Sequence, residues 1–426
     1  MKIAIAGYGL EGESNFRYFS SNTDNLITIA DQKTPSRPIP SGIDTIIGED
    51  AFQRLEGFDM VVRTAGLAPR KIKTDGKIWS ATNEFFEKCP AGIIGVTGSK
   101  GKGTTASLIA SILDAAGKKV WLVGNIGVAV LDIIEQIHPN DIIVYELSSF
   151  QLWDIEKSPH VAVVLFIEQE HLDVHTDTDE YVLAKTNITK YQNNDDILIY
   201  NQSNQFAKSI AEKSTAHLLG YPNKESAHVN GGYFYYGEQK ICSVNSLTIA
   251  GKFNQDNACA AIDAVWGITN DSSVIQKGLN SFSGLPHRLQ LVRELDGVKY
   301  YDDSFATIPG AAIAAISAFD GPKVVILGGS SKGSNFTNLG LELAKQDVKA
   351  ILIGNESENI ANSCKEAGYN NYEIMEYISM DEVVRRAQSL SAPGGFVLLS
   401  PACASFDNFK NYSDRGDKFS AAVNRL

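Results

Sequence analysis

Cysteine is scarce in this sequence and forms no recognisable pattern. The 426 residues include five cysteines, which are odd in number and widely spaced. No pair has the CxxC spacing, and no group of Cys and His residues has the spacing of a metal site. The simplest interpretation is a protein of a reducing compartment that does not depend on disulfides.

Long apolar runs are also missing. No stretch approaches the roughly 20 apolar residues that a membrane-spanning helix requires. Residues 2–6 have the pattern of a short strand, and we expect no signal peptide there. The sequence thus predicts a soluble, cytoplasmic protein with no membrane partner.

Basic side chains are outnumbered by acidic ones. Lys and Arg total 38 against 50 Asp and Glu, a formal net charge of -12. Nucleic acids and anionic membranes are bound by basic surfaces, so we expect neither as a partner. Binding of a small anionic ligand stays compatible with this net charge, because a few local cations and backbone N–H groups can hold one. Hydrophobic residues make up 43% of the chain, enough to bury real cores.

Short apolar runs alternate with helical patterns along the chain, which is typical of parallel sheets built from βαβ units. At about 150 residues per domain, we expect an α/β protein of three domains, with boundaries at 1–89, 90–284 and 285–426. Residues 233–236 and 241–244 predict a β-hairpin inside the second domain. Other predicted strands are 2–6, 26–30, 60–62, 93–96, 120–123, 142–146, 161–167, 197–200, 299–301, 324–327, 350–353 and 396–399. Predicted helices include 83–88, 104–116 and 258–265.

The first glycine-rich turn lies between a predicted strand and a predicted helix. Gly7, Gly9 and Gly12 fit GxGxxG, and Asp31 ends the next strand. In a dinucleotide site such glycines let a phosphate approach the helix N-terminus, and the acid binds a ribose hydroxyl. Alone, the pattern indicates a Rossmann-like domain of an NAD-dependent enzyme. The structural alternative is a plain strand-to-helix turn with Asp31 as a helix cap.

A second glycine-rich loop also follows an apolar strand and opens a helix. It reads Gly98-Ser99-Lys100-Gly101-Lys102-Gly103-Thr104-Thr105. Backbone N–H groups of such a loop surround phosphate oxygens, the Lys102 ammonium reaches between phosphates, and the Thr104 hydroxyl can hold Mg²⁺. The strict P-loop pattern is not met, because Val96 stands at its first glycine and Gly103 follows the lysine. Two phosphate loops favour an enzyme that uses one nucleotide as a substrate handle and another as an energy source.

Two polar segments follow neighbouring predicted strands. Glu146 ends one strand, and His171 follows the next, at the edge of a parallel sheet where ligands bind. We expect a cation site shared by these two residues. The alternative for the first segment is a helix-capping pair, Ser148 and Ser149, with an incidental acid. Lys185 lies on the following helix and, from residue type alone, is a solvated lysine.

Several segments in order resemble one family, the Mur ligases of peptidoglycan synthesis, over almost the whole chain. The segments ELSSFQL, LPHR and SPACASFD carry the resemblance most specifically. The full set is residues 98–102, 125–127, 146–152, 170–173, 284–288, 303–307, 328–332 and 400–407.

The resemblance implies three substrates and a mechanism. A Rossmann-like first domain would bind the UDP end of UDP-N-acetylmuramoyl-L-alanine. A central P-loop ATPase domain, mostly parallel with a small β-hairpin region, would bind ATP and Mg²⁺. A Rossmann-like third domain would bring D-glutamate. ATP would phosphorylate the substrate carboxylate, and the glutamate amine would displace phosphate from the acyl phosphate. The resemblance further implies a monomer.

The resemblance also implies residue roles. Catalytic roles fall on Lys102, His171 and Lys185, the last as a carbamate formed with CO₂. Magnesium ligands would be Thr104, Glu146, His171 and Lys185. Nucleotide contacts beyond the phosphate loop would be Asn257, Arg288 and Asp303. The other substrates would be held by Gly9, Leu10, Asp31, Asn125, Ser148, Gln151, Thr307, Lys332, Ser405 and Tyr412.

The sequence departs from the family pattern at a few positions. Phe305 stands where the family has Lys, and Phe253 where it has His. Residues 64–66 read Thr-Ala-Gly in place of Ser-Pro-Gly. The alternatives are a Mur-type or folylpolyglutamate-type ligase for a different amino acid, an NAD-dependent oxidoreductase, and a nucleotide-binding regulator without catalysis.

Overall fold

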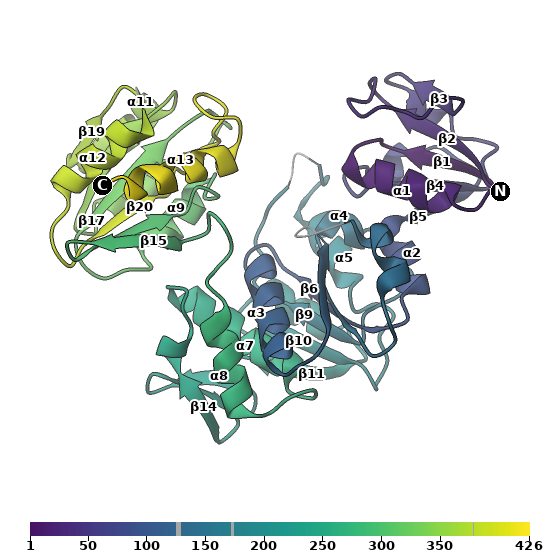
Figure 1. Ribbon diagram of the computed structural model, residues 1–426, viewed down its shortest axis with the longest axis horizontal. Helices are drawn as coiled ribbons and strands as arrows, with labels where there is room; N and C mark the ends of the chain where they lie inside the picture. Colours follow the sequence, from purple (N-terminus) through teal and green to yellow (C-terminus); the bar gives the residue numbers. More distant parts are fainter. Residues whose placement is uncertain (125–128, 172–173, 378) are drawn as a thin grey trace. The chain divides into compact units, whose positions relative to one another are not determined.

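The computed structural model describes residues 1–124, 129–171, 174–377 and 379–426. Within these ranges the strands form four sheets (Figure 1). The chain divides into two compact units. One comprises Met1–Leu247 with Gln255–Ser281, and the other Thr248–Asn254 with Phe282–Leu426.

The first sheet is parallel and has five strands in the order β3-β2-β1-β4-β5. Its strands are β1 (Lys2–Ala6), β2 (Leu26–Asp31), β3 (Asp44–Ile47), β4 (Met60–Arg63) and β5 (Lys77–Ser80), with helices α1 (Leu10–Ser20) and α2 (Ala81–Lys88). The order reverses beside β1, so the first glycine turn lies at a topological switch point, where Rossmann-like sheets bind ligands.

The second sheet is also parallel and has six strands in the order β11-β10-β9-β6-β8-β7. Its strands are β6 (Gly92–Thr97), β7 (Val120–Gly124), β8 (Ile142–Glu146), β9 (Val161–Val164), β10 (Ile197–Asn201) and β11 (His217–Tyr221). Its helices are α3 (Lys102–Ala115), α4 (Ser149–Leu152), α5 (Thr178–Thr186) and α6 (Gln205–Ala211). Because β6 lies between β8 and β9, the segments that follow these three strands meet at one edge.

Strand β9 is shorter than predicted: it ends at Val164 and not at residue 167. The backbone beyond it bonds to the phosphate loop. Ser99 N–H donates to Phe166 O at 2.8 Å, and Glu168 N–H donates to Ser99 Oγ at 2.9 Å.

The predicted hairpin is confirmed as part of a three-stranded antiparallel sheet. This sheet comprises β12 (Ala227–Asn230), β13 (Tyr233–Tyr236) and β14 (Gln239–Ser243), followed by α7 (Lys252–Val265) and α8 (Ser272–Ser281). Helix α7 begins earlier than the predicted residue 258.

The last sheet has six strands in the order β15-β16-β20-β17-β18-β19, with only β15 antiparallel to its neighbour. Its strands are β15 (Gln290–Leu295), β16 (Val298–Asp302), β17 (Lys323–Gly328), β18 (Val348–Ile353), β19 (Tyr372–Ile374) and β20 (Phe396–Leu399). Its helices are α9 (Pro309–Ile316), α10 (Thr337–Leu343), α11 (Ser357–Glu366), α12 (Met380–Leu390) and α13 (Tyr412–Asn424).

Hydrophobic clusters fill both faces of the central strands. Every residue of β17 is buried, as expected for a strand that packs helices on both faces of a parallel sheet. One cluster lies on each face of the last sheet, and another runs through the first two sheets. The predicted α/β class with mostly parallel sheets is confirmed. The exact domain boundaries stay a prediction.

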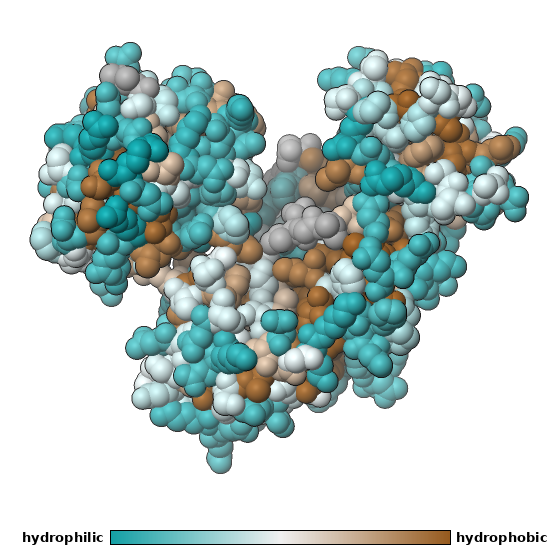
Figure 2. Space-filling model, viewed as in Figure 1, coloured by the Kyte–Doolittle hydropathy of each residue, from teal (hydrophilic) through white to brown (hydrophobic). Residues whose placement is uncertain are grey.

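The face drawn in Figure 2 is covered largely by hydrophilic residues, with hydrophobic residues in separate areas. Among the helices of the described ranges, none combines the length and apolar character needed to cross a bilayer. This agrees with the lack of long apolar runs in the sequence.

Candidate active site

The second glycine loop leads from β6 into α3 through two left-handed glycines. Gly98 has φ +153° and Gly101 has φ +84°. A Cβ on Gly98 would lie 2.8 Å from Leu165 Cβ, and one on Gly101 only 2.4 Å from Asn257 Oδ1. Only glycine therefore lets the loop turn this tightly and lets Asn257 approach. The predicted phosphate loop and Asn257 are brought together.

The loop is bonded to its neighbours on several sides. The Ser99 hydroxyl donates to Glu168 O at 2.8 Å and lies 2.8 Å from the Tyr181 hydroxyl oxygen. Lys100 forms an ion pair with Glu168. Thr104 lies in the first turn of α3 and is 9% exposed. The backbone N–H groups at the start of α3 and the Lys102 side chain thus share one end of the helix, as anion binding requires.

Lys102 and Lys185 converge on this loop from different helices. Lys102 Nζ donates to Gly98 O and to Ser99 O, both at 2.9 Å. Lys185 Nζ donates to the same Gly98 oxygen at 2.9 Å and lies 4.6 Å from the centre of the Tyr181 ring.

Lys185 is not the solvated lysine that its residue type suggests, because it is only 1% exposed. Burial lowers the pKa of its amine well below the ordinary value, and the Lys102 ammonium lowers it further. The Glu170 and Glu146 carboxylates act in the opposite direction. In the structure, loss of hydration is the larger cause of the lowering.

Glu146 lies at the end of β8 and His171 after β9, the two strands that flank β6 in the second sheet. Glu146 ends β8, is 3% exposed and is paired in register with Val96 of β6. His171 has φ +58°, and its ring centre lies 5.0 Å from that of Phe150. In the part of the chain that the structure describes, no group of three or more His, Cys, Asp or Glu side chains is placed to hold a metal ion. The predicted metal set contains only two residues of these types.

His175 is a residue of this region that the sequence argument did not select. It is 2% exposed, its Nε2 lies 3.0 Å from Ser149 Oγ, and its ring stacks on Phe150 at 5.4 Å. Burial lowers the pKa of the imidazole. The signal available in the sequence was its position four residues after His171. It supports the segment that carries Ser148 to Leu152 and orders the aromatic wall beside His171.

The alternative of a capping pair, Ser148 and Ser149, is confirmed for Ser148 only: it caps α4 and forms a capping box with Gln151, whereas Ser149 is the first residue of the helix. Ser148 N–H donates to Gln151 Oε1 at 2.9 Å, and Gln151 N–H donates to Ser148 Oγ at 3.3 Å. Capping accounts for the serine and glutamine, but leaves the acid at the end of β8 unexplained.

The first glycine turn and Asp31 also meet. Asp31 Oδ2 accepts a hydrogen bond from Tyr8 N–H at 2.8 Å. Gly9 is the N-cap of α1, and Leu10, its first residue, is 64% exposed. Asn125, the remaining predicted UDP contact, lies outside the described residues.

A third group of predicted residues lies in the unit that contains the last sheet. Lys332 Nζ donates to Thr307 Oγ1 at 3.2 Å. Ser405 is 2% exposed, and Tyr412 begins α13 and is 39% exposed. Asp303 is buried, and burial raises the pKa of its carboxyl to about 7, although Ser400 Oγ–H and Leu289 N–H donate to it.

Arg415 is a second residue that the sequence argument missed. It is 1% exposed, and its guanidinium donates to Ser304 Oγ, Ser304 O, Ala404 O and Cys403 O at 2.9 to 3.2 Å. It thereby ties α13 to the two segments that carry Asp303 and Ser405. No local sequence pattern marks this role, because the acceptors are backbone groups remote in the chain.

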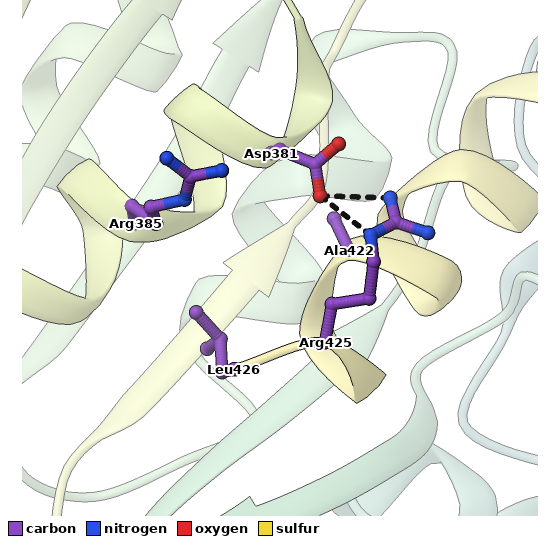
Figure 3. Close-up of a pocket in the computed structure, with 5 residues that line it drawn as sticks. All are labelled: Asp381, Arg385, Ala422, Arg425 and Leu426. Atoms are coloured by element: carbon purple, nitrogen blue, oxygen red, sulfur yellow. Dashed lines mark hydrogen bonds and ion pairs between the residues drawn. The ribbon is translucent and has the colours of Figure 1, made fainter.

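A cavity of about 370 Å³ lies at α12 and α13 (Figure 3). It is lined by Asp381, Arg385, Ala422, Arg425 and Leu426, and Arg425 pairs with Asp381 at 2.7 Å. None of the predicted site residues lines it, so we do not assign it a role in the reaction.

A family model described as the Mur ligase middle domain matches residues 96–265, and one described as the Mur ligase, glutamate ligase domain matches residues 287–403. A UDP-N-acetylmuramoylalanine--D-glutamate ligase of Clostridium tetani is 35% identical over 447 residues, with 100% of this chain and 97% of the relative covered. The chain belongs to the Mur ligase family. The corresponding ligase of Clostridium acetobutylicum is 36% identical over 450 residues, with coverage of 100% and 96%.

Solved structures of other ligases share the fold of this chain. UDP-N-acetylmuramate-alanine ligase MurC of Thermotoga maritima matches with a TM-score of 0.61 at 16% identity, over 100% of this chain and 99% of that one. A folylpolyglutamate synthase of Mycobacterium tuberculosis matches with a TM-score of 0.59 at 14% identity, over 81% and 93%. At these identities the likeness concerns the fold alone.

Proposed function

We infer that this Mur ligase couples ATP hydrolysis to the addition of D-glutamate to UDP-N-acetylmuramoyl-L-alanine. The observation that carries the inference is full-length similarity to D-glutamate ligases, together with a phosphate loop on which Lys102 and Lys185 converge. The reaction belongs to the synthesis of peptidoglycan precursors. ATP phosphorylates the alanine carboxylate, and the glutamate amine then attacks the acyl phosphate and releases inorganic phosphate.

The phosphate loop is proposed to hold the ATP phosphates. Gly98 to Thr105 supply backbone N–H groups at the N-terminus of α3, and the Lys102 ammonium offsets the charge of the transferred phosphoryl group. Asn257, packed against Gly101, is proposed to contact the nucleotide from α7. Arg288 and buried Asp303, in the unit that contains the last sheet, are further proposed nucleotide contacts.

The residues at the end of β8 fit Mg²⁺ in their chemistry. Mg²⁺ prefers oxygen ligands, and the Glu146 carboxylate and Thr104 hydroxyl offer them beside the phosphate loop. His171 adds a nitrogen ligand, and a carbamate on Lys185 would add oxygens. When bound, Mg²⁺ supplies charge neutralisation at the phosphates.

The carbamate on Lys185 is proposed because the amine is buried and its pKa is lowered. An uncharged amine adds to CO₂, forms an N–C bond and releases one proton. The product places a carboxylate on the long lysine arm, next to Gly98. Labelled bicarbonate tests this, since a carbamate carbon signal is expected in the wild type and not in Lys185→Met.

The other two substrates are proposed to use separate sites. Lys332 and Thr307, joined by a hydrogen bond, together with Ser405 and Tyr412 would hold the glutamate carboxylates. Gly9, Leu10 and Asp31 at the switch point of the first sheet would contact the UDP-sugar, with Asn125, Ser148 and Gln151 as further substrate contacts. His171 would assist in catalysis beside Lys102 and Lys185.

The test is phosphate release with ATP, Mg²⁺ and UDP-N-acetylmuramoyl-L-alanine across a panel of amino acids. We expect release with D-glutamate to exceed that with L-glutamate, alanine or lysine. Release with a different amino acid would reassign the substrate, and ATP binding without any release would favour a regulator. An absorbance change with NADH and no ATP use would favour the oxidoreductase, which the relatives do not support.

A further inference from the structure

The loop that carries Arg288 has an unusual backbone. Both neighbours of Arg288 are non-glycine residues in the left-handed region, with φ +60° at His287 and φ +42° at Leu289. Such conformations persist where surrounding contacts hold them, and they occur often at functional sites.

The contacts that hold this loop come from the segment that contains Phe305. Phe305 N–H donates to His287 O at 3.0 Å, and Leu289 N–H donates to Asp303 Oδ1 at 3.1 Å. Arg288 lies between these two bonds. The backbone geometry therefore fixes where the Arg288 side chain starts and places residue 305 directly beside it.

The Phe305 side chain completes this arrangement. The guanidinium carbon of Arg288 lies 3.9 Å from the centre of the Phe305 ring, within cation–π range. The Tyr412 ring packs edge-on against Phe305, with centres 4.9 Å apart and planes at 85°. Phe305 and Tyr412 are each 39% exposed, so the stack stands at the surface of its unit and does not belong to the core.

We propose that Phe305 is a positioning residue that orients the Arg288 guanidinium for the anionic nucleotide. The proposal deepens the proposed function and rests on its assignment of Arg288 as a nucleotide contact. A long arginine side chain loses rotamer freedom on binding, and a stack that orders it beforehand lowers this cost.

The test is steady-state kinetics of the full-length enzyme with Phe305→Leu, Phe305→Trp and Arg288→Ala. Phe305→Leu should raise KM for ATP about three- to tenfold with little change in kcat, the range of a partly exposed cation–π contact. Phe305→Trp, which retains an aromatic face, should keep KM near the wild-type value. Tyr233→Leu is the matched control, because it removes a similar pair, Lys240 over Tyr233 at 3.2 Å, on the three-stranded sheet. It should leave KM unchanged.

A double-mutant cycle separates positioning from general damage. In the Arg288→Ala background, Phe305→Leu should have no further effect on KM. An equal effect in both backgrounds, or an unchanged KM in Phe305→Leu, would overturn the proposal. If the wild type shows no ligation, the proposed function fails. In that case the dissociation constant of the non-hydrolysable analogue AMPPNP, measured by calorimetry, tests the Arg288–Phe305 pair. The same variants are used, and the ratios expected for KM are then expected for this dissociation constant.

Discussion

Lys102 and Lys185 donate hydrogen bonds to one shared oxygen, the carbonyl of Gly98, each at 2.9 Å. Burial penalises the charge on Lys185, and the two ammonium groups on one acceptor repel each other. The pKa of Lys185 is lowered for both reasons. In the proposed function, Lys102 is the cation for the phosphates and Lys185 is the amine that reacts with CO₂.

Removing the Lys185 amine should abolish most ligation without unfolding the protein. Lys185→Met retains much of the buried side-chain volume, so its melting temperature should stay close to that of the wild type. We expect kcat to fall by about 100-fold or more, because a fixed charge beside the reacting phosphate is lost. Wild-type activity should also fall in CO₂-free buffer and return with bicarbonate, whereas the variant should not respond. A normal rate in Lys185→Met would place the lysine outside the site.

Lys102→Ala should stop ATP-dependent ligation, with a loss of about 10³-fold in kcat, because the ammonium proposed to offset the charge of the transferred phosphoryl group is removed. Phosphate release is the measurement. Lys118→Ala, at an exposed position just after the C-terminal end of α3, is the control and should retain full turnover. Retained turnover in Lys102→Ala would contradict the assigned role.

Asp263 makes stability depend on pH. Burial on α7 raises the pKa of its carboxyl to about 8, and Oδ1 accepts from Ala227 N–H at 2.8 Å. In the unfolded chain an aspartate ionises near pH 4, as is usual for the residue. Its contribution to stability is therefore full below about pH 4 and is lost progressively as the pH rises to about 8.

Asp263→Asn should remove this loss. The variant should be more stable than the wild type at pH 7.5, on the order of 3 kcal/mol, with a smaller difference at pH 5. Thermal unfolding at the two pH values measures this, and Asp24→Asn, which replaces an exposed carboxylate, is the control. A difference that grows toward acid pH would refute the assignment.

Arg63 anchors the first sheet to the α4 segment of the same unit. Its side chain is fully buried, pairs with Asp154 and donates to Phe150 O at 3.0 Å. Arg63→Met should lower the free energy of unfolding by about 3 kcal/mol, because it leaves Asp154 without its counter-charge. Arg63→Met with Asp154→Leu should recover part of this loss. Urea denaturation followed by tryptophan fluorescence is the measurement. If the losses in the free energy of unfolding of the two single variants simply add in the double variant, the two side chains do not stabilise each other.

Most interior strands could be predicted from the sequence, and the missed ones have a common position. Strands β3, β5, β11, β12, β15 and β19 all lie at sheet edges. An edge strand packs on fewer neighbours, so it lacks the continuous apolar run by which a strand such as β17 is recognised. Strand β3, for example, has no fully buried residue.

The candidate site could be predicted only as far as local motifs extend. Residues 98–105 and Glu146 carry their signal in spacing and in their place after a strand. Arg415 carries none, because most of its acceptors are backbone groups of other segments, and His175 carries only its position four residues after His171.

The sequence by itself determined the α/β class, the phosphate loop and the membership of the Mur ligase family, because each depends on patterns within short segments. Only the tertiary structure decided that Lys185 is buried beside Lys102 and that Phe305 supports Arg288. Both relationships join side chains far apart in the chain, and the order of the strands brings them together. Their environments, and hence the lowered pKa of Lys185 and the position of the Arg288 guanidinium over the Phe305 ring, arise only once the chain has folded.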